Sequence, residues 1–178
     1  MSDLARQYKE KIIPEMKKKF GYDNDLAVPK IVKVVVSSGT GSIKDEAKKE
    51  NIRKSLALIT GQKPIENKAR KSIASFKTRK GAVIGYSVTL RGKRMYDFLE
   101  RLVKVAIPRV RDFRGIDAKN IDNQGNLNIG FREHIVFPEV SDQDVRESFG
   151  LGVTVVTTAK TKEEAVELLK LFGFPFKK

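Results

Sequence analysis

The sequence predicts a single two-layer α+β domain over residues 1–178, in which a mostly antiparallel sheet carries helices on one face. Helical and extended patterns are interspersed along the chain, without an internal repeat or a low-complexity linker. One extended segment, residues 82–91, alternates apolar side chains with small or polar ones, as in a strand with one covered and one open face. The basic stretch that precedes it predicts an extended loop beside the sheet.

Four helices are expected where apolar residues recur at three- or four-residue spacing. Two of them have start signals, because Ser42–Asp45 and Thr161–Glu164 have the spacing of a capping box. Pro14 lies inside the first helix and should kink it or split it in two. The expected helices cover residues 3–20, 42–60, 93–107 and 161–173.

Strands are expected where β-branched residues cluster or where apolar and polar residues alternate. The first of these segments, residues 30–36, is rich in Val and Ile and should be buried. Residues 134–139 and 141–144 are expected to be irregular. The expected strands cover residues 30–36, 65–68, 82–91, 127–131 and 152–158.

The composition excludes several classes of protein and site. The chain has no cysteine, so disulfides, thiolate metal sites and cysteine nucleophiles are excluded. No apolar run reaches the ~18 residues of a membrane span, and the N-terminal segment lacks the apolar core of a signal peptide. A cytoplasmic location is therefore expected.

The positive charge is concentrated in one region of the chain. The formal net charge is +14, and residues 61–94 hold ten Lys or Arg against a single acid, Glu66. Such a stretch gains little by burial, and its self-repulsion is relieved by a polyanion. The open face of the strand at residues 82–91 suits RNA, because small residues let a backbone approach while hydroxyl groups and Arg reach phosphates or 2′-hydroxyls.

Catalysis, metal binding and cofactor binding receive little support from the sequence. The only histidine, His134, follows Glu133 without a marked serine partner, which favours a structural role. With one His and no Cys, only dispersed carboxylates remain as metal ligands. No metal and no cofactor are therefore expected.

Two alternatives from other functional classes remain. Ser38–Ser42, a glycine loop between a strand and a helix, could cradle the phosphates of a nucleotide and make the chain a nucleotide-binding enzyme. It lacks the Gly-Lys-Ser/Thr of a P-loop and the third glycine of a dinucleotide site. The other alternative is a basic nucleic-acid chaperone without RNA preference.

The aromatic residue of the basic stretch, Phe76, has two interpretations. It lies between the polar residues Ser75 and Lys77. It could fold back onto the sheet, or it could be a stacking tip on an extruded arm at residues 69–81.

Several motifs together resemble the bacterial form of the ribosomal protein family that carries 5S ribosomal RNA in the large subunit. The resemblance covers nearly the whole chain in the right order. The motifs are Gly61–Pro64, Lys68–Lys77, Leu90–Gly92, Met95–Leu102, Pro108–Arg109, Asp112–Gly115, Gly130–His134 and Phe137–Glu139. One departure is Ser37-Ser38-Gly39, where such proteins usually have Asn-Met-Gly.

The resemblance implies a non-catalytic, monomeric component of the central protuberance that binds 5S rRNA and an adjoining hairpin of the large-subunit rRNA. Lys63, Lys68, Arg70, Arg91 and Arg94 are expected to capture phosphates, while hydrogen bonds from Gln62, Ser87 and Thr89 fix the register. The expected rRNA-binding residues are Ser37, Gly39, Gly41, Gln62, Lys63, Pro64, Lys68, Arg70, Ser87, Thr89, Arg91 and Arg94.

The resemblance also implies two contacts beyond rRNA. The arm reaches the transfer RNA in the P site, with Ser72, Ser75, Phe76, Lys77, Arg79 and Lys80 as expected contacts. Another edge touches a small-subunit ribosomal protein across the subunit interface, with Arg109, Arg111, Asp112, Phe113, Arg114, Pro138 and Asp142 as expected contacts.

Overall fold

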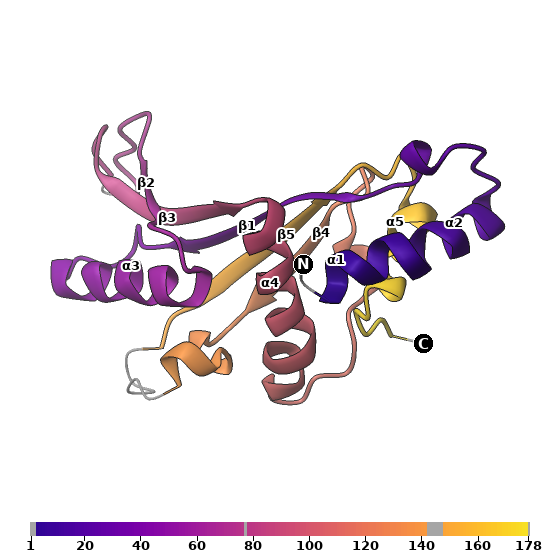
Figure 1. The fold of residues 1–178 in the computed structure, drawn as a ribbon. Coiled ribbons are helices and arrows are strands. Elements are labelled where there is room, and N and C mark those ends of the chain that lie inside the picture. The colour runs from indigo at the N-terminus through magenta and orange to yellow at the C-terminus, as the bar shows by residue number, and fades with distance from the viewer. Residues whose placement is uncertain (1–2, 77, 142–147, 178) are drawn as a thin grey trace. The chain divides into compact units, whose positions relative to one another are not determined.

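A computed structural model describes residues 3–76, 78–141 and 148–177, and it contains a five-stranded sheet with the strand order β2-β3-β1-β5-β4 (Figure 1). β2 and β3 are antiparallel. Backbone and side-chain hydrogen bonds join Lys30 to Thr158 and Ser38 to Gly150, so β1 and β5 are antiparallel too. The predicted α+β class is confirmed. The strands are β1 Ile31–Gly39, β2 Ile65–Lys68, β3 Val83–Leu90, β4 Leu127–Phe131 and β5 Leu151–Thr157.

The chain divides into two compact units, and both β1 and β5 contribute residues to each of them. The first unit contains Met1–Val34, Leu90–Ile129 and Thr154–Lys178. The second unit contains Val35–Thr89 and Gly130–Val153. Most of the expected rRNA-binding residues and the whole arm belong to the second unit.

In the first unit, two helices pass through a π turn just before a proline. α1 (Asp3–Gln7) continues through a π turn at Tyr8–Ile12 into α2 (Ile13–Phe20), so Pro14 does not split the helix. α4 (Gly92–Arg101) likewise enters a π turn at Leu102–Ala106 before Pro108. Proline has no N–H and its ring clashes with the carbonyl four residues earlier, and the wider turn relieves both conflicts.

Tyr8 anchors the first helix to the core of the first unit. Its ring stacks on Phe172 with a centroid distance of 5.9 Å, and its hydroxyl donates a hydrogen bond of 3.1 Å to the carbonyl of Pro29. Leu4, Ile12 and Met16 are buried on the same side of the helix. Burial raises the pKa of Tyr8 from 10.0 to about 12, because the phenolate would lose its hydration.

This raised pKa predicts a loss of stability at alkaline pH. The unfolded tyrosine loses its proton near pH 10, whereas the folded one keeps it until about pH 12, so the stabilisation is complete below pH 10 and is lost as the pH rises through 12. Between pH 9.5 and 12, Tyr8→Phe should reduce the fall in the free energy of unfolding by on the order of 1 kcal/mol, after allowance for solvent screening. Urea unfolding of both proteins at each pH measures it, and an identical fall in both would contradict the assignment.

In the second unit, the segment between β1 and the following helix differs from expectation. Ser37, Ser38 and Gly39 lie in β1 and not in a turn, since the hydroxyl of Ser38 donates a hydrogen bond of 2.8 Å to the carbonyl of Gly150. The helix α3 (Glu46–Thr60) begins later than Ser42, because the Asp45 carboxylate accepts the N–H of Ala47 at 2.9 Å and caps it.

The remaining elements lie close to their predicted positions. The last helix, α5 (Lys162–Leu171), is capped by Thr161 as the capping box predicts. Residues 134–140 form two short 3₁₀ turns, His134–Val136 and Pro138–Val140, in the segment expected to be irregular. Within the described part of the chain, no helix is both long and apolar enough to cross a membrane.

Candidate nucleic-acid interface

The open face of β3 is built by its pairing with β2. Ile65 lies opposite Ser87 and Asn67 lies opposite Gly85 in the antiparallel register. Tyr86, Val88 and Leu90 are buried, whereas Thr89 is exposed and Ser87 is half-buried. The predicted alternation is therefore confirmed over residues 86–90, whereas Gly85, expected on the open face, is buried. Ile84, expected on the buried face, is 38% exposed and lies near the start of β3, before its buried residues.

Gly85 allows β3 to approach β1 closely. A Cβ atom at this position would lie 2.8 Å from the carbonyl oxygen of Ser38, inside van der Waals contact. Next to it, the N–H of Thr40 donates to the carbonyl of Ile84 at 2.9 Å. Ser38 is itself 5% exposed, so its side chain is buried in the fold and is not available to a ligand.

The loop after α3 holds Gln62 at the edge of this face. Gly61 ends the helix in the left-handed conformation, and the Gln62 amide then donates a hydrogen bond of 3.2 Å to the carbonyl of Thr89. Pro64 is buried and Lys63 is exposed. The structure thus brings Gln62, Lys63, Ser87 and Thr89 together, and we call these four residues the platform.

Three polar residues beside the platform were missed by the sequence analysis. Asn67 accepts a hydrogen bond of 3.1 Å from the Ser87 hydroxyl. Arg53 and Lys54 on α3 line a hollow of about 420 Å³ together with Gln62 and Lys63. Arg53 also donates two hydrogen bonds to Glu50, which lower the pKa of that carboxyl. Their positions follow from the packing of α3, which no local motif indicates.

The arm at residues 69–81 is a paired hairpin that extends from β2 and β3 (Figure 1). Ala69 exchanges hydrogen bonds with the Gly81–Ala82 segment at 2.9 Å, and Ile73 and Thr78 pair through bonds of 3.0 and 3.1 Å. The N–H of Lys80 donates to the Ser72 hydroxyl at 3.0 Å. The backbone pairing therefore gives the arm a defined shape.

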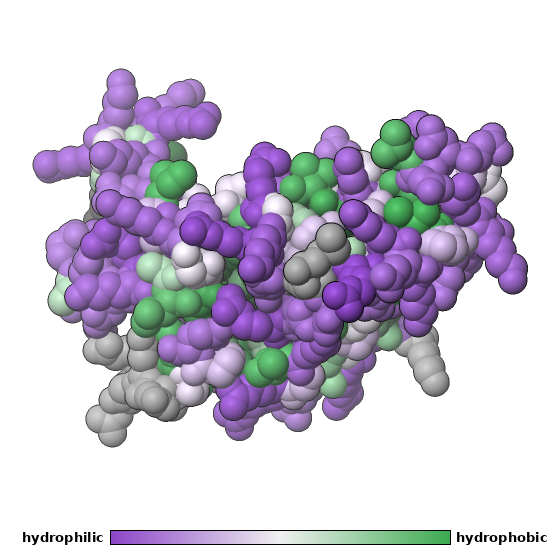
Figure 2. All heavy atoms as spheres, viewed as in Figure 1, coloured by the Kyte–Doolittle hydropathy of each residue, from purple (hydrophilic) through white to green (hydrophobic). Residues whose placement is uncertain are grey.

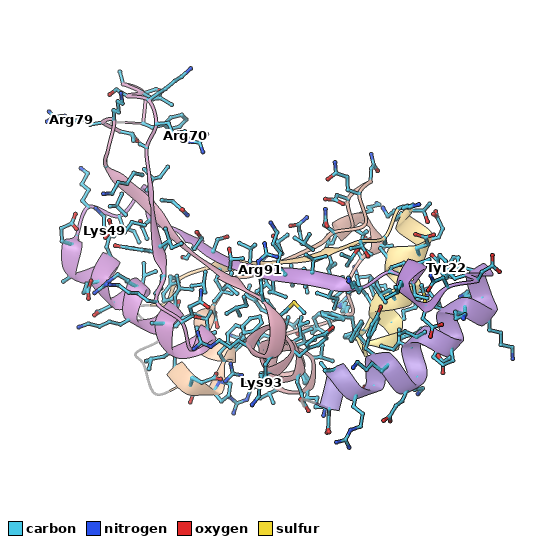
Figure 3. All side chains as sticks on the ribbon, turned by 45° about the horizontal axis from the view of Figure 1, so that its top comes forward. Tyr22, Lys49, Arg70, Arg79, Arg91 and Lys93 are labelled. Carbon is cyan, nitrogen blue, oxygen red and sulfur yellow. The ribbon has the colours of Figure 1, made fainter. Side chains whose placement is uncertain are left out.

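Most of the described side chains of the arm are exposed. Arg70 and Arg79 project from the arm (Figure 3), and Figure 2 shows mainly hydrophilic side chains there. Phe76 is 74% exposed, which favours the interpretation as a tip over one folded onto the sheet. Lys77 lies outside the described residues. Ser72, Ser75, Arg79 and Lys80 are exposed.

The other expected rRNA-binding residues have varied environments. In the second unit, Gly39, Gly41, Lys68 and Arg70 are exposed and Ser37 is half-buried. The carboxylate of Glu66 lies 3.8 Å from the Lys68 ammonium group. Arg91 and Arg94, which belong to the first unit, are both exposed.

The residues expected at the subunit interface fall in separate segments. In the first unit, one loop carries exposed Arg109, Arg111, Asp112 and Arg114 beside half-buried Phe113. Asp112 has a φ of 52°, a left-handed conformation that aspartate tolerates. Pro138 is exposed in the second unit. Asp142 lies outside the described residues.

The nucleotide-binding alternative is not supported by the geometry. A phosphate site of that kind needs a glycine loop that leads directly into free N–H groups at a helix N-terminus. Here Ser38 is buried in a strand, and the helix begins only at Glu46. The carboxylate of Asp45 already occupies the first turn and would repel a phosphate.

His134 has a structural environment. It is fully buried, its ring stacks on Phe149 with a centroid distance of 4.0 Å, and its Nδ1 accepts the N–H of Phe149 at 3.3 Å. Among residues 3–76, 78–141 and 148–177, no three His, Asp or Glu side chains gather in a metal-binding arrangement.

Proteins that are similar to this chain belong to one ribosomal protein family. Residues 24–79 match a family described as ribosomal protein L5, and residues 83–176 match the C-terminal region described for the same ribosomal family. The chain is 54% identical over 177 residues to large ribosomal subunit protein uL5 of Halothermothrix orenii, covering 99% of each chain. It is 50% identical to the proteins of the same name from Dictyoglomus thermophilum, over 100% of each chain, and from Thermus thermophilus, over 98% of this chain and 97% of the relative.

Proposed function

Because the chain belongs to the ribosomal protein L5 family, whose members are structural components of the large ribosomal subunit, we propose that it binds 5S rRNA through its platform. The family assignment makes the chain a ribosomal protein and not an enzyme. The partner RNA and the contacting residues are the proposed part.

The observation that carries this proposal is the open face of the platform. Thr89 is exposed and Ser87 half-buried on this face, where Ile65 of β2 is an exposed apolar neighbour of Ser87, and Lys63 adds an exposed cation at the edge. Gln62 is already oriented by its hydrogen bond to the Thr89 carbonyl, so its amide oxygen remains available. Such a surface allows close approach of an RNA backbone and reads 2′-hydroxyls.

The remaining contacts extend the proposal. Lys68, Arg70, Arg91 and Arg94 contribute phosphate contacts to 5S rRNA and to adjoining large-subunit rRNA. The arm contacts P-site tRNA through Phe76 and its basic residues. The loop at residues 109–114, with Pro138 and Asp142, touches a small-subunit protein. A nucleic-acid chaperone without RNA preference is the competing function, because phosphates attract a basic arm in any sequence.

Competition binding tests the choice of partner. Purified protein should bind 5S rRNA more tightly than an unrelated RNA of equal length at moderate salt, and the affinity should fall steeply with salt because several phosphates are neutralised. Lys63→Gln should weaken this binding. It should also reduce the slope of log affinity against log salt concentration by about 1, because one phosphate contact is lost. Equal affinity for both RNAs would reject the proposal and favour the chaperone.

Thr89→Ala tests the platform at a single hydroxyl. The side chain is exposed, so stability should change by less than about 0.5 kcal/mol. Affinity for 5S rRNA should fall by about 1–3 kcal/mol, since the RNA group that the hydroxyl meets is left unpaired. Filter binding with wild type and variant measures the difference. Unchanged affinity would remove Thr89 from the interface.

A further inference from the structure

An apolar groove lies between the arm and the turn that follows β1, all within the second unit. It has a volume of about 660 Å³ and is lined by Gly41, Ala69, Ile73, Phe76 and Ile84 among others. Ile73 is 46%, Phe76 74% and Ile84 38% exposed. Single exposed apolar residues are ordinary, but three around one hollow of ligand size indicate a binding site.

The rim of the groove is basic. Arg70 and Lys71 line it, and both side chains are exposed. Within the part of the chain that the structure describes, neither forms an ion pair with a carboxylate. The site therefore combines an apolar wall with cations that have no anion of their own. That combination suits a ligand with a flat apolar part and an attached anion.

We propose that this groove binds one unpaired nucleotide of RNA, with the base against Phe76 and Ile84 and the phosphate at Arg70 and Lys71. The inference rests on the proposed function only in taking RNA as the partner class. It adds that the arm recognises an extruded base and not only phosphates. Aromatic and aliphatic surfaces are the usual seat of such bases, and guanidinium groups bind their phosphates.

The hairpin pairing holds the walls of the groove in place before a ligand binds. Ile73 is fixed by its two hydrogen bonds to Thr78, and Ala69 by its bonds to the base of the arm. Opposite them, Ile84 carries the carbonyl that accepts the N–H of Thr40. A base can therefore enter without the cost of ordering these backbone segments.

Gly41 offers a way to fill the groove without changing its charge. A Cβ atom there would make ordinary contacts of 3.8 Å with Ile84, and the residue has no left-handed φ. Gly41→Leu should therefore fold normally and occupy the space intended for the base. Gly41→Ala, which adds one methyl group, checks that the backbone tolerates a side chain.

The test uses the full chain and a short RNA duplex with a single bulged 2-aminopurine, compared with the same duplex carrying an abasic residue at the bulge. The wild type should bind the 2-aminopurine RNA about tenfold more tightly and quench its fluorescence, as expected for one stacked base. Gly41→Leu and Phe76→Ala should each abolish this preference. Leu26→Ala, which truncates a residue that is 89% exposed outside the groove, is the matched control and should keep it.

The outcomes separate this inference from the proposed function. Equal affinity of the wild type for the two bulged RNAs, or a preference that survives in Gly41→Leu, would overturn the groove. If the base preference holds while 5S rRNA binds no better than unrelated RNA, the groove stands and the proposed partner falls.

Discussion

Gly85→Ala is expected to lower the free energy of unfolding by about 2–3 kcal/mol, the cost of forcing an atom into a packed contact. The new Cβ would meet the Ser38 carbonyl oxygen at 2.8 Å, and this oxygen belongs to the backbone of the neighbouring strand. Relief requires β3 to move away from β1, which weakens the hydrogen bond from Thr40 to Ile84. Urea unfolding measures the change.

Gly130→Ala is the matched control for Gly85→Ala. Gly130 also lies inside a strand, β4, but a Cβ atom there would have no neighbour within 4 Å. Glycine inside a strand costs conformational entropy, so this change should be neutral or stabilising by up to about 1 kcal/mol. Similar losses in both variants would show that close approach at Gly85 is not what the fold requires.

The same contact shows what the sequence could not reveal. Alternation along residues 86–90 predicted which face of β3 is open, because a period of two is a local property. The need for glycine at position 85 depends on Ser38, which lies 47 positions earlier in the sequence. For the same reason β1 was predicted to end too early, since the partner of Ser38 is the carbonyl of Gly150.

Helix starts show a second reason for error. Ser42 and Asp45 are both good capping residues, and the helix was predicted to begin at Ser42. The structure selects Asp45, whose carboxylate is hydrogen-bonded to Ala47. At Thr161 only one capping residue stands in the right register, and the prediction was correct. Capping residues thus predict the start of a helix well where only one of them is in the right position.

The candidate site was predictable in its charge and less so in its shape. Ten cations in residues 61–94 indicated a polyanion, and the polar residues of β3 indicated its open face. The groove behind the arm joins Gly41, Ile73 and Ile84, which share no motif or periodicity. Only the pairing of the arm and of β3 brings them to one place.

The second large effect concerns the arm. Replacing Lys71–Lys80 with Asn-Gly, a pair that favours a tight hairpin turn, should leave the fold stable because the removed residues are mainly exposed. The yield of crosslinks to P-site tRNA should fall more than about tenfold, as expected for the loss of a stacking residue and several cations. Crosslinking of ribosome-bound protein to P-site tRNA measures this.

The shortened arm must be compared with a variant of the platform, because removing cations weakens any RNA binding to some degree. Lys63→Gln should weaken 5S rRNA binding while leaving the tRNA crosslink unchanged, and the shortened arm should do the opposite. The salt dependence separates the two surfaces further, since its slope reports the phosphates neutralised in each complex. If the shortened arm reduced the slope for 5S rRNA as much as Lys63→Gln does, the arm and the platform would bind one RNA, and their proposed division would be wrong.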